Sequence, residues 1–375
     1  MTKVDLITGF LGSGKTTFIK EYVRYLLDKG EKVGIIENDY GAINVDMLLL
    51  DSEFGDECRM EMVVAADPDC HRRRFKTKLI AMGMESEKLD RVIVEPSGIY
   101  DVDEFFDILY EEPLDRFYEI GNVIAIVDSG LSDDLSKESD YLLVSQIAEA
   151  GMVVFSKVTS EAPVDVYKLE DKEGYICDKQ MQNLEFFDVE RVVDHMNRAL
   201  ERFKCSRRYD KASKDIMVKP WENLTVVDFE RIENCGYVPE DHIKLHVAED
   251  NGYKSLFYYH VKMTEDELKK VTEGLFSDKS FGNIYRVKGF VPLEDNGIDD
   301  GDGLSGAEDE YAQTAYNKYM QINATSERVE ITHTDNGQEV IIVIGEGLDN
   351  GRIEDYIRAY SSEKDITAGQ SNHRH

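Results

Sequence analysis

The sequence predicts an α/β protein: a parallel sheet covered by helices on both faces, followed by a small α+β domain. Two observations support this prediction. In the first half of the chain, short and nearly continuous apolar runs alternate with segments of helical periodicity, which is typical of buried parallel strands. From about Lys254, runs of strand-like sequence are accompanied by helices, which is typical of an α+β domain.

Apolar runs are expected to form the parallel sheet, and the segments between them its helices. The first helix, residues 16–27, has apolar residues at helical spacing and is closed by Gly30. Residues 160–187 are polar and mixed, so we interpret them as an insertion. The expected strands are residues 4–7, 32–37, 91–95, 122–128, 151–156 and a short one at 215–218; later helices are 188–203 and 225–232.

The C-terminal part predicts a helix at 264–276 that begins with a capping box, because Glu267 follows Thr264 by three residues. Its strands are expected at 255–263 and 283–291, and at 328–334 and 338–346 as a hairpin, before a last helix at 353–360. The predicted domains are therefore 1–240, which includes the insertion, then 252–360, and a flexible tail at 361–375.

The composition of the chain limits the kinds of molecule that it is expected to bind. Across 375 residues the chain has 76 acidic and 44 basic side chains, a formal charge of −32, which would repel nucleic acid and anionic membranes. No apolar run approaches the ~20 residues that cross a bilayer, and the first residues lack the features of a secretory signal. The five cysteines form no C-x-x-C pair and are expected to be free thiols. We therefore expect a soluble, cytoplasmic protein that binds neither nucleic acid nor membrane.

A glycine-rich loop lies between the first expected strand and the first expected helix. Residues 9–16, GFLGSGKT, match the pattern G-x-x-x-x-G-K-[ST] of the phosphate-binding P-loop. Glycines let backbone N–H groups turn toward a β-phosphate, Lys15 reaches the β- and γ-oxygens, and Thr16 offers a hydroxyl to Mg²⁺. The residues expected to contact a nucleotide from this segment are Gly9, Gly12, Ser13, Gly14, Lys15, Thr16 and Thr17.

An acid at the end of a neighbouring strand should hold Mg²⁺ together with Thr16. Glu95 ends one strand and precedes Pro96-Ser97-Gly98, while Asp128 ends another, where it could equally cap the strand. Asp39 follows the second strand, where a mobile loop would meet the γ-phosphate; the other interpretation is a turn-forming Asn-Asp pair. Lys15, Asp39 and Glu95 are the candidate catalytic residues.

The segments GFLGSGKTT, ENDYGAINVD, VIVEPSG, VIAIVDS and FSK together resemble the CobW/HypB/UreG family of P-loop GTPases. IYRVKGFV, at 284–291, is similar to part of the C-terminal domain of CobW-type metallochaperones. The resemblance implies a P-loop NTPase fold, GTP binding with slow Mg²⁺-dependent hydrolysis, and delivery of a metal or metal cofactor. It also implies that Glu95 and Gly98 sense Mg²⁺ and the γ-phosphate, that Asp39 lies in switch I, and that Ser156-Lys157 replaces the start of the base-recognition N-K-x-D.

The base-recognition segment departs from the family pattern, because it is Ser156-Lys157-Val158-Thr159. Thr159 replaces the aspartate that would accept both guanine N1–H and N2–H, and the loss of a bidentate base contact costs ~1–3 kcal/mol of discrimination. Lys157 can still cover the base with its alkyl stem. GTP is the expected nucleotide, with ATP or loose specificity as the alternative.

A second departure lies where CobW-type proteins commonly carry C-x-C-C. Here the segment is Asp67-Pro68-Asp69-Cys70, followed by His71, so that carboxylates replace two of three thiolates. Mixed ligands hold zinc or cobalt less tightly and less selectively than thiolates do. A working site would bind Zn²⁺ or Co²⁺ through Asp67, Asp69, Cys70 and His71; alternatively, the site is lost and Asp-Pro-Asp begins a helix whose basic side chains at 72–74 balance local acids.

Two functional hypotheses follow. The first is a Mg²⁺-dependent GTPase that couples its nucleotide state to metal or metal-cofactor delivery to a client metalloprotein. The second is a regulatory nucleotide-binding activator or scaffold of a cobalamin- or metal-dependent enzyme, with no metal site of its own, and the altered C-x-C-C segment supports it. Trp221, beside Pro220, is expected to be packed rather than functional.

Overall fold

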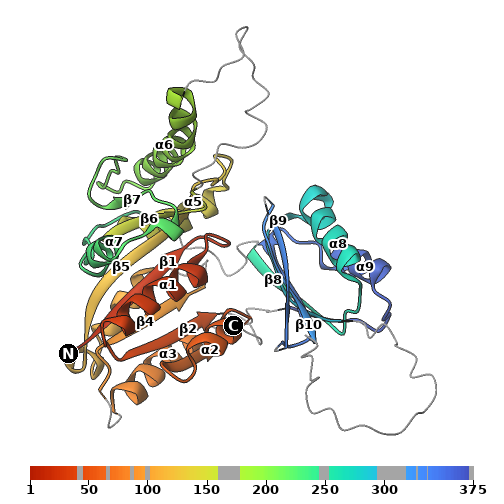
Figure 1. Cartoon of the computed structure of the whole chain (residues 1–375), viewed down its shortest axis with the longest axis horizontal. Helices are drawn as coiled ribbons and strands as arrows, with labels where there is room; N and C mark the ends of the chain where they lie inside the picture. Colours follow the sequence, from red (N-terminus) through yellow and green to blue (C-terminus); the bar gives the residue numbers. More distant parts are fainter. Residues whose placement is uncertain are drawn as a thin grey trace, which may run out of the picture. The chain divides into compact units, whose positions relative to one another are not determined.

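The computed structural model describes residues 1–39, 45–64, 68–84, 88–97, 102–158, 178–244, 253–293, 318–326, 328–335 and 337–370. The chain divides near residue 248 into two compact units, each with its own sheet (Figure 1).

The first unit is built on a seven-stranded sheet in the order β3-β2-β4-β1-β5-β6-β7, with every neighbouring pair parallel. This confirms the predicted P-loop NTPase type of sheet. Its elements are β1 (Thr2–Gly9), α1 (Lys15–Asp28), β2 (Val33–Asp39), α2 (Val45–Phe54), β3 (Arg59–Val64), α3 (Pro68–Gly83), β4 (Arg91–Pro96), α4 (Val102–Leu109), a 3₁₀ turn (Leu114–Arg116), β5 (Tyr118–Asp128), α5 (Lys137–Ala148), β6 (Met152–Ser156), α6 (Asp178–Arg202), β7 (Ile216–Met217), a 3₁₀ turn η3 (Trp221–Asn223) and α7 (Val226–Glu233).

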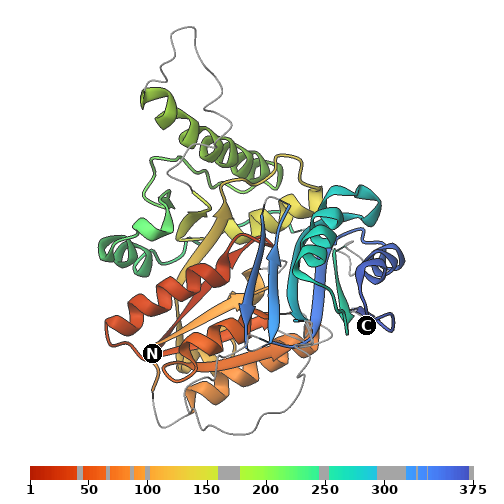
Figure 2. The same ribbon diagram turned by 45° about the vertical axis from the view of Figure 1, so that its right-hand side comes forward.

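Helices cover both faces of this sheet (Figures 1 and 2). On one face, Phe18 of α1 and Phe229 of α7 share a buried cluster with Ile7, Ile93 and Ile124 of three adjacent strands. The helices α3, α4, α5 and α6 contact one another in that order and cover the other face. Because both faces are buried, the strands are almost continuously apolar, which is why the sequence pattern predicted them.

A buried ion pair ties the central strands together. Asp5 of β1 is 0% exposed and Arg91 of β4 is 2% exposed, and their side chains are 2.7 Å apart. The Asp5 carboxylate also accepts hydrogen bonds from the Tyr22 hydroxyl of α1 (2.8 Å) and from the backbone N–H of Asn122 in β5 (2.8 Å). Three strands and one helix therefore converge on a single carboxylate.

Glu233, at the end of α7, extends this buried network. It lies 3.3 Å from Arg91 and accepts hydrogen bonds from the Tyr25 hydroxyl (2.8 Å) and from the Lys29 ammonium. Burial alone would raise the pKa of Glu233, but the hydrogen bonds from Lys29 and Tyr25 lower the pKa below its usual value. Glu233 is therefore a carboxylate that fixes α7 against α1 and the sheet.

The second unit is a six-stranded sheet in the order β11-β10-β9-β12-β8-β13, antiparallel throughout, and α8 packs against β9, β11 and α9. This confirms the predicted α+β domain. The Thr264–Glu267 capping box is also confirmed at the start of α8. The elements are β8 (Tyr253–Tyr259), α8 (Glu265–Ser277), a 3₁₀ turn (Lys279–Phe281), β9 (Asn283–Pro292), β10 (Tyr319–Ala324), β11 (Val329–Thr334), β12 (Val340–Glu346), α9 (Asn350–Tyr360) and β13 (Thr367–Gln370).

The predicted hairpin of residues 328–334 and 338–346 is wrong. β11 pairs with β10, whereas β12 lies between β9 and β8. The residues of β12 from Val340 to Gly345 are buried, so this strand takes a central place, and the unpredicted strand β10 supplies the partner of β11.

Three other elements differ from the predictions. β3 was not predicted, and α6 begins at Asp178, inside the stretch interpreted as an insertion; residues 159–177 lie outside the described part. The prediction of a flexible tail does not hold for Thr367–Gln370, because these residues form β13 and pair with β8. Their backbone hydrogen bonds, rather than a strong apolar pattern, place them in the sheet.

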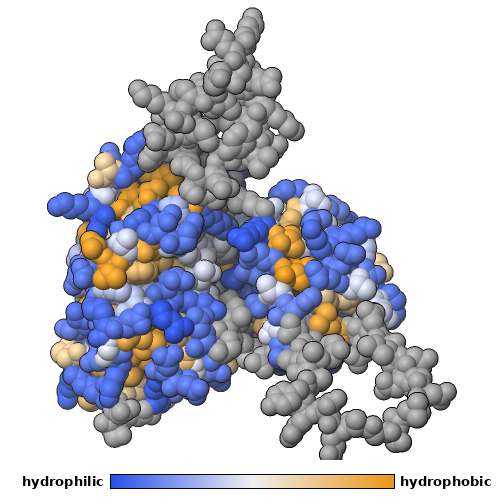
Figure 3. All heavy atoms as spheres, in the orientation of Figure 1, coloured by the Kyte–Doolittle hydropathy of each residue, from blue (hydrophilic) through white to orange (hydrophobic). Residues whose placement is uncertain are grey.

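Hydrophilic side chains cover most of each unit on the face shown in Figure 3, and apolar ones are confined to small patches. Among the described residues, no helix has the length and hydrophobicity needed to cross a bilayer.

We expect Arg91→Met to lower the free energy of unfolding by about 3–5 kcal/mol, because it leaves the Asp5 carboxylate buried without its cation. Chemical denaturation of the full chain measures the change. Arg116→Met is the matched control: Arg116 is 66% exposed and pairs with Glu112 on the surface, so its loss should change stability by at most about 0.5 kcal/mol. Equal unfolding midpoints for the two variants would contradict the role of the buried pair.

Candidate nucleotide-binding site

The P-loop connects the carboxyl end of β1 to the first turn of α1. Gly9 has φ +150°, and a Cβ there would lie 2.3 Å from the carbonyl oxygen of Ile126 in β5, so only glycine fits between the strands. Gly14 has φ +95°, and its carbonyl accepts the first helical hydrogen bond, from the N–H of Phe18 (3.0 Å). These two glycines fold the loop back over the start of α1.

The start of α1 is suited to an anion. Its first turn has no acidic side chain of its own, and the positive end of a helix dipole attracts anions. The Ser13 hydroxyl is 2% exposed and has no hydrogen-bond partner within the described part of the chain. The Lys15 ammonium donates to the Gly9 carbonyl (3.1 Å), which holds it over the same loop. Thr17 is exposed on the helix beside them.

The predicted magnesium ligands lie together. The Thr16 hydroxyl donates to Glu95 Oε1 over 2.9 Å, and both side chains are buried. This contact joins the first turn of α1 to the carboxyl end of β4, the strand next to β1. A hydroxyl and a carboxylate beside a phosphate-binding loop match the oxygen ligands of Mg²⁺, so Thr16 and Glu95 fit a nucleotide-bound magnesium ion.

Glu37 belongs to this site and was not predicted. It is 3% exposed, and its Cα lies directly opposite that of Glu95 in the pairing of β2 with β4. A glutamate that ends an apolar strand run, as Glu95 does, is the signal that could have identified it, because a buried carboxylate requires a partner. The site thus has two adjacent buried glutamates at one edge of the sheet.

The residues predicted for base recognition lie across β1 from Glu95. Ser156 ends β6; it is buried, and its hydroxyl donates to the Val127 carbonyl of β5 (3.4 Å). Lys157 has φ +55°, and its ammonium pairs with the Asp128 carboxylate, which also accepts the N–H of Gly130 (2.9 Å). The Asp128 contacts match the strand-end cap rather than a magnesium ligand.

Several predicted site residues fall outside the described part. Asp39 ends β2, but its side chain is not among the described ones, and Gly98 and Asp67 are not described at all. The first turn of α3 contains Asp69, Cys70 and His71, whose side chains are also not among the described ones. The described residues contain no group of three metal-ligating side chains.

Two basic side chains of α3 support the interpretation that this segment balances local acids. Arg72 and Lys76 both pair with Glu111, which follows α4. Hydrogen bonds from Lys76 and Arg72 lower the pKa of Glu111. These two cations therefore balance a local acid.

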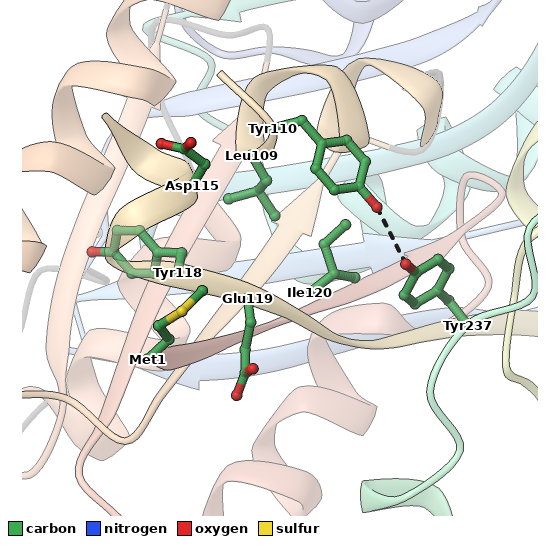
Figure 4. A pocket seen from close by; sticks show the side chains of 8 residues that line it. All are labelled: Met1, Leu109, Tyr110, Asp115, Tyr118, Glu119, Ile120 and Tyr237. Atoms are coloured by element: carbon green, nitrogen blue, oxygen red, sulfur yellow. Dashed lines mark hydrogen bonds between the residues drawn. The ribbon is translucent and has the colours of Figure 1, made fainter. Parts of the chain in front are cut away.

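A pocket of about 280 Å³ lies away from the P-loop, at the amino-terminal ends of β1 and β5 (Figure 4). Its lining includes Met1, Leu109, Glu119 and the tyrosines Tyr110 and Tyr237, whose hydroxyls are 3.2 Å apart. The hydrogen bond to Tyr237, with burial, raises the pKa of Tyr110 to about 12. None of the predicted site residues lines this pocket.

Comparison with known proteins agrees with this geometry. Residues 3–181 match the sequence profile of the CobW/HypB/UreG nucleotide-binding domain. Residues 3–181 are a CobW/HypB/UreG nucleotide-binding domain. The predicted family resemblance is thereby confirmed for this domain, and the P-loop, Thr16 and Glu95 all lie within the matched range.

Three relatives have names that describe their activity. The zinc chaperone YeiR of Escherichia coli is 27% identical over 164 residues, which are 44% of this chain and 48% of YeiR. The zinc chaperone YjiA of the same organism is 28% identical over 163 residues, 41% of this chain and 48% of YjiA. The zinc-regulated GTPase metalloprotein activator 1 of Dictyostelium discoideum is 24% identical over 322 residues, 76% of this chain and 62% of the relative. This chain therefore spans about half the length of the two bacterial relatives.

We expect Glu95→Gln to weaken magnesium binding in the presence of GTP by about 10- to 100-fold, because the amide loses the negative charge beside Thr16. Titration of Mg²⁺ against the protein with a fluorescent GTP analogue measures this. Glu119→Gln serves as the control, because it removes an exposed carboxylate at the amino-terminal end of β5, away from the P-loop. If both variants require the same Mg²⁺ concentration as the wild type, Glu95 is not at the magnesium site.

Proposed function

We propose that this protein binds GTP with Mg²⁺, hydrolyses it slowly, and uses its nucleotide state to control delivery of a metal ion or metal cofactor to a client protein. The observation that carries the proposal is the convergence of Lys15, Thr16 and Glu95 on one P-loop inside a CobW/HypB/UreG domain. The names of the bacterial relatives favour zinc as the cargo, with cobalt as the alternative. The free thiols Cys58, Cys205 and Cys235 are in keeping with a cytoplasmic setting.

In this mechanism the chain mainly positions the nucleotide and neutralises the charge of its phosphates. The backbone N–H groups of the P-loop and the start of α1 bind the phosphates, and Lys15 turns from the Gly9 carbonyl to the β- and γ-oxygens. Mg²⁺ held by Thr16 and Glu95 would neutralise charge that develops between the β- and γ-phosphates. Asp39 ends β2, and the γ-phosphate would act on the switch I segment to which we assign it. Because the chain contributes little beyond positioning and charge neutralisation, turnover by the chain alone should be slow.

We expect Lys15→Ala to weaken GTP binding by at least about 30-fold, because the variant removes the cation that contacts the β- and γ-phosphates, a loss of about 2–5 kcal/mol. Calorimetric titration of GTP and of ATP into the magnesium-loaded full chain measures the affinities. Lys20→Ala removes a half-buried cation of α1 that pairs with Glu53 of α2, and this variant should bind as the wild type does. Undiminished binding by Lys15→Ala would remove the nucleotide assignment, and equal wild-type affinities for GTP and ATP would establish loose specificity.

The cargo site is proposed to include Asp67, Asp69, Cys70 and His71. We expect the wild type to bind about one Zn²⁺ per chain in equilibrium dialysis, and the double variant Asp69→Ala, Cys70→Ala to lose it. Cys235→Ala, which removes a half-buried thiol elsewhere in the first unit, is the control and should retain the ion.

The same dialysis decides between the proposal and its alternative. A wild-type protein that binds neither Zn²⁺ nor Co²⁺, with or without GTP, would favour a regulatory activator or scaffold of a cobalamin- or metal-dependent enzyme. The replacement of two thiolates by Asp67 and Asp69 is the observation that favours this second function.

A further inference from the structure

Trp221, the single tryptophan of the chain, lies beside the P-loop. A Cβ built on Gly14 would be 3.2 Å from Cη2 and 3.6 Å from Cζ3 of the indole, so the six-membered ring lies against the last glycine before Lys15. The indole N–H donates to the Phe155 carbonyl of β6 (3.0 Å), and the ring contacts Phe18 edge-on, with centroids 5.6 Å apart. These contacts fix the orientation of a ring that is only half-buried.

The sheet order indicates which part of a nucleotide would reach this ring. Glu95, which marks the magnesium side of the site, is on β4, on one side of β1. β5, β6 and β7 lie on the other side, and η3, which begins with Trp221, follows β7. A nucleotide whose γ-phosphate lies toward Glu95 must extend its nucleoside toward the side that carries Ser156, Lys157 and Trp221. Ser156 Cβ is itself 3.8 Å from the same point on Gly14.

We propose that Trp221 is the stacking surface for the nucleoside of the bound nucleotide, and that it provides affinity without selecting guanine. This inference rests on the proposed nucleotide-binding function. Every purine presents a π-face, so an aromatic platform binds GTP and ATP alike. At Thr159 the sequence lacks the carboxylate that would select guanine. A fixed, half-buried indole would restore part of the lost affinity but none of the lost discrimination, so the favoured ligand class is purine nucleoside triphosphates in general.

The single indole makes the test direct, because all tryptophan fluorescence of the full chain comes from Trp221. Mg²⁺-GTP and Mg²⁺-ATP should both change its emission on binding, whereas inorganic tripolyphosphate, which occupies the P-loop without a base, should compete for the site and leave the emission nearly unchanged. Emission that does not respond to saturating GTP, with binding verified by calorimetry, would overturn the inference.

Two variants measure the contribution to affinity. Trp221→Ala should weaken the binding of GTP and ATP by roughly 5- to 100-fold, and Trp221→Phe, which keeps an aromatic face, should retain most of the affinity. Both should bind tripolyphosphate as the wild type does. Equal losses for tripolyphosphate and GTP would overturn the inference, because they would mean that the ring only supports the P-loop at Gly14.

The outcomes separate this inference from the proposed function. A wild type that binds neither nucleotide nor tripolyphosphate overturns both. Nucleotide binding that is unchanged in Trp221→Ala overturns the stacking role alone. Should Trp221→Ala fail to fold, as judged by its thermal unfolding, the fluorescence titration of the wild type and the affinity of Trp221→Phe still decide the question.

Discussion

The buried contact between Asp5 and Arg91 is the constraint on which the first unit depends. It joins β1 to β4, and through Tyr22, Asn122 and Glu233 it also holds α1, β5 and α7. A carboxylate buried this completely is tolerable only when its cation and hydrogen-bond donors are all in place, so the packing of these elements is coupled. The network therefore fixes the relative position of the two strands whose opposite ends carry the P-loop and Glu95.

The parallel direction of the strands brings the residues of the nucleotide-binding site together. Because β1, β2 and β4 are parallel, their carboxyl ends meet at one edge, and residues far apart in the sequence become neighbours: Thr16 contacts Glu95, and Glu37 lies opposite Glu95 in the strand register. This is why the phosphate-binding part could be predicted from sequence. The glycine spacing specifies the backbone path of the P-loop. Parallel strands have their carboxyl ends on the same side of the sheet, so Glu95 at the end of β4 is expected near that loop.

What the sequence did not predict depended on pairing or packing rather than on local pattern. Residues 340–345 are a buried strand, but nothing local in them indicates that β9 and β8, rather than β11, are their partners. The place of Glu37 opposite Glu95 depends on the register of β2 with β4. The position of Trp221 against Gly14 depends on how η3 returns to the sheet after β7. Such long-range contacts have no periodicity that a single sequence can display.

The four residues of β13 have a consequence for the assembly of the second unit. They pair with Leu256–Tyr259 and so occupy hydrogen-bonding groups of β8 that would otherwise be unpaired within this sheet. A strand with an unpaired edge can form hydrogen bonds with a strand from another molecule, whereas a very short edge strand has few groups available for such pairing. In a chain shortened before Thr367, the free edge of β8 could pair with a strand of a second copy. The residues of β13 therefore prevent the sheet from extending between molecules.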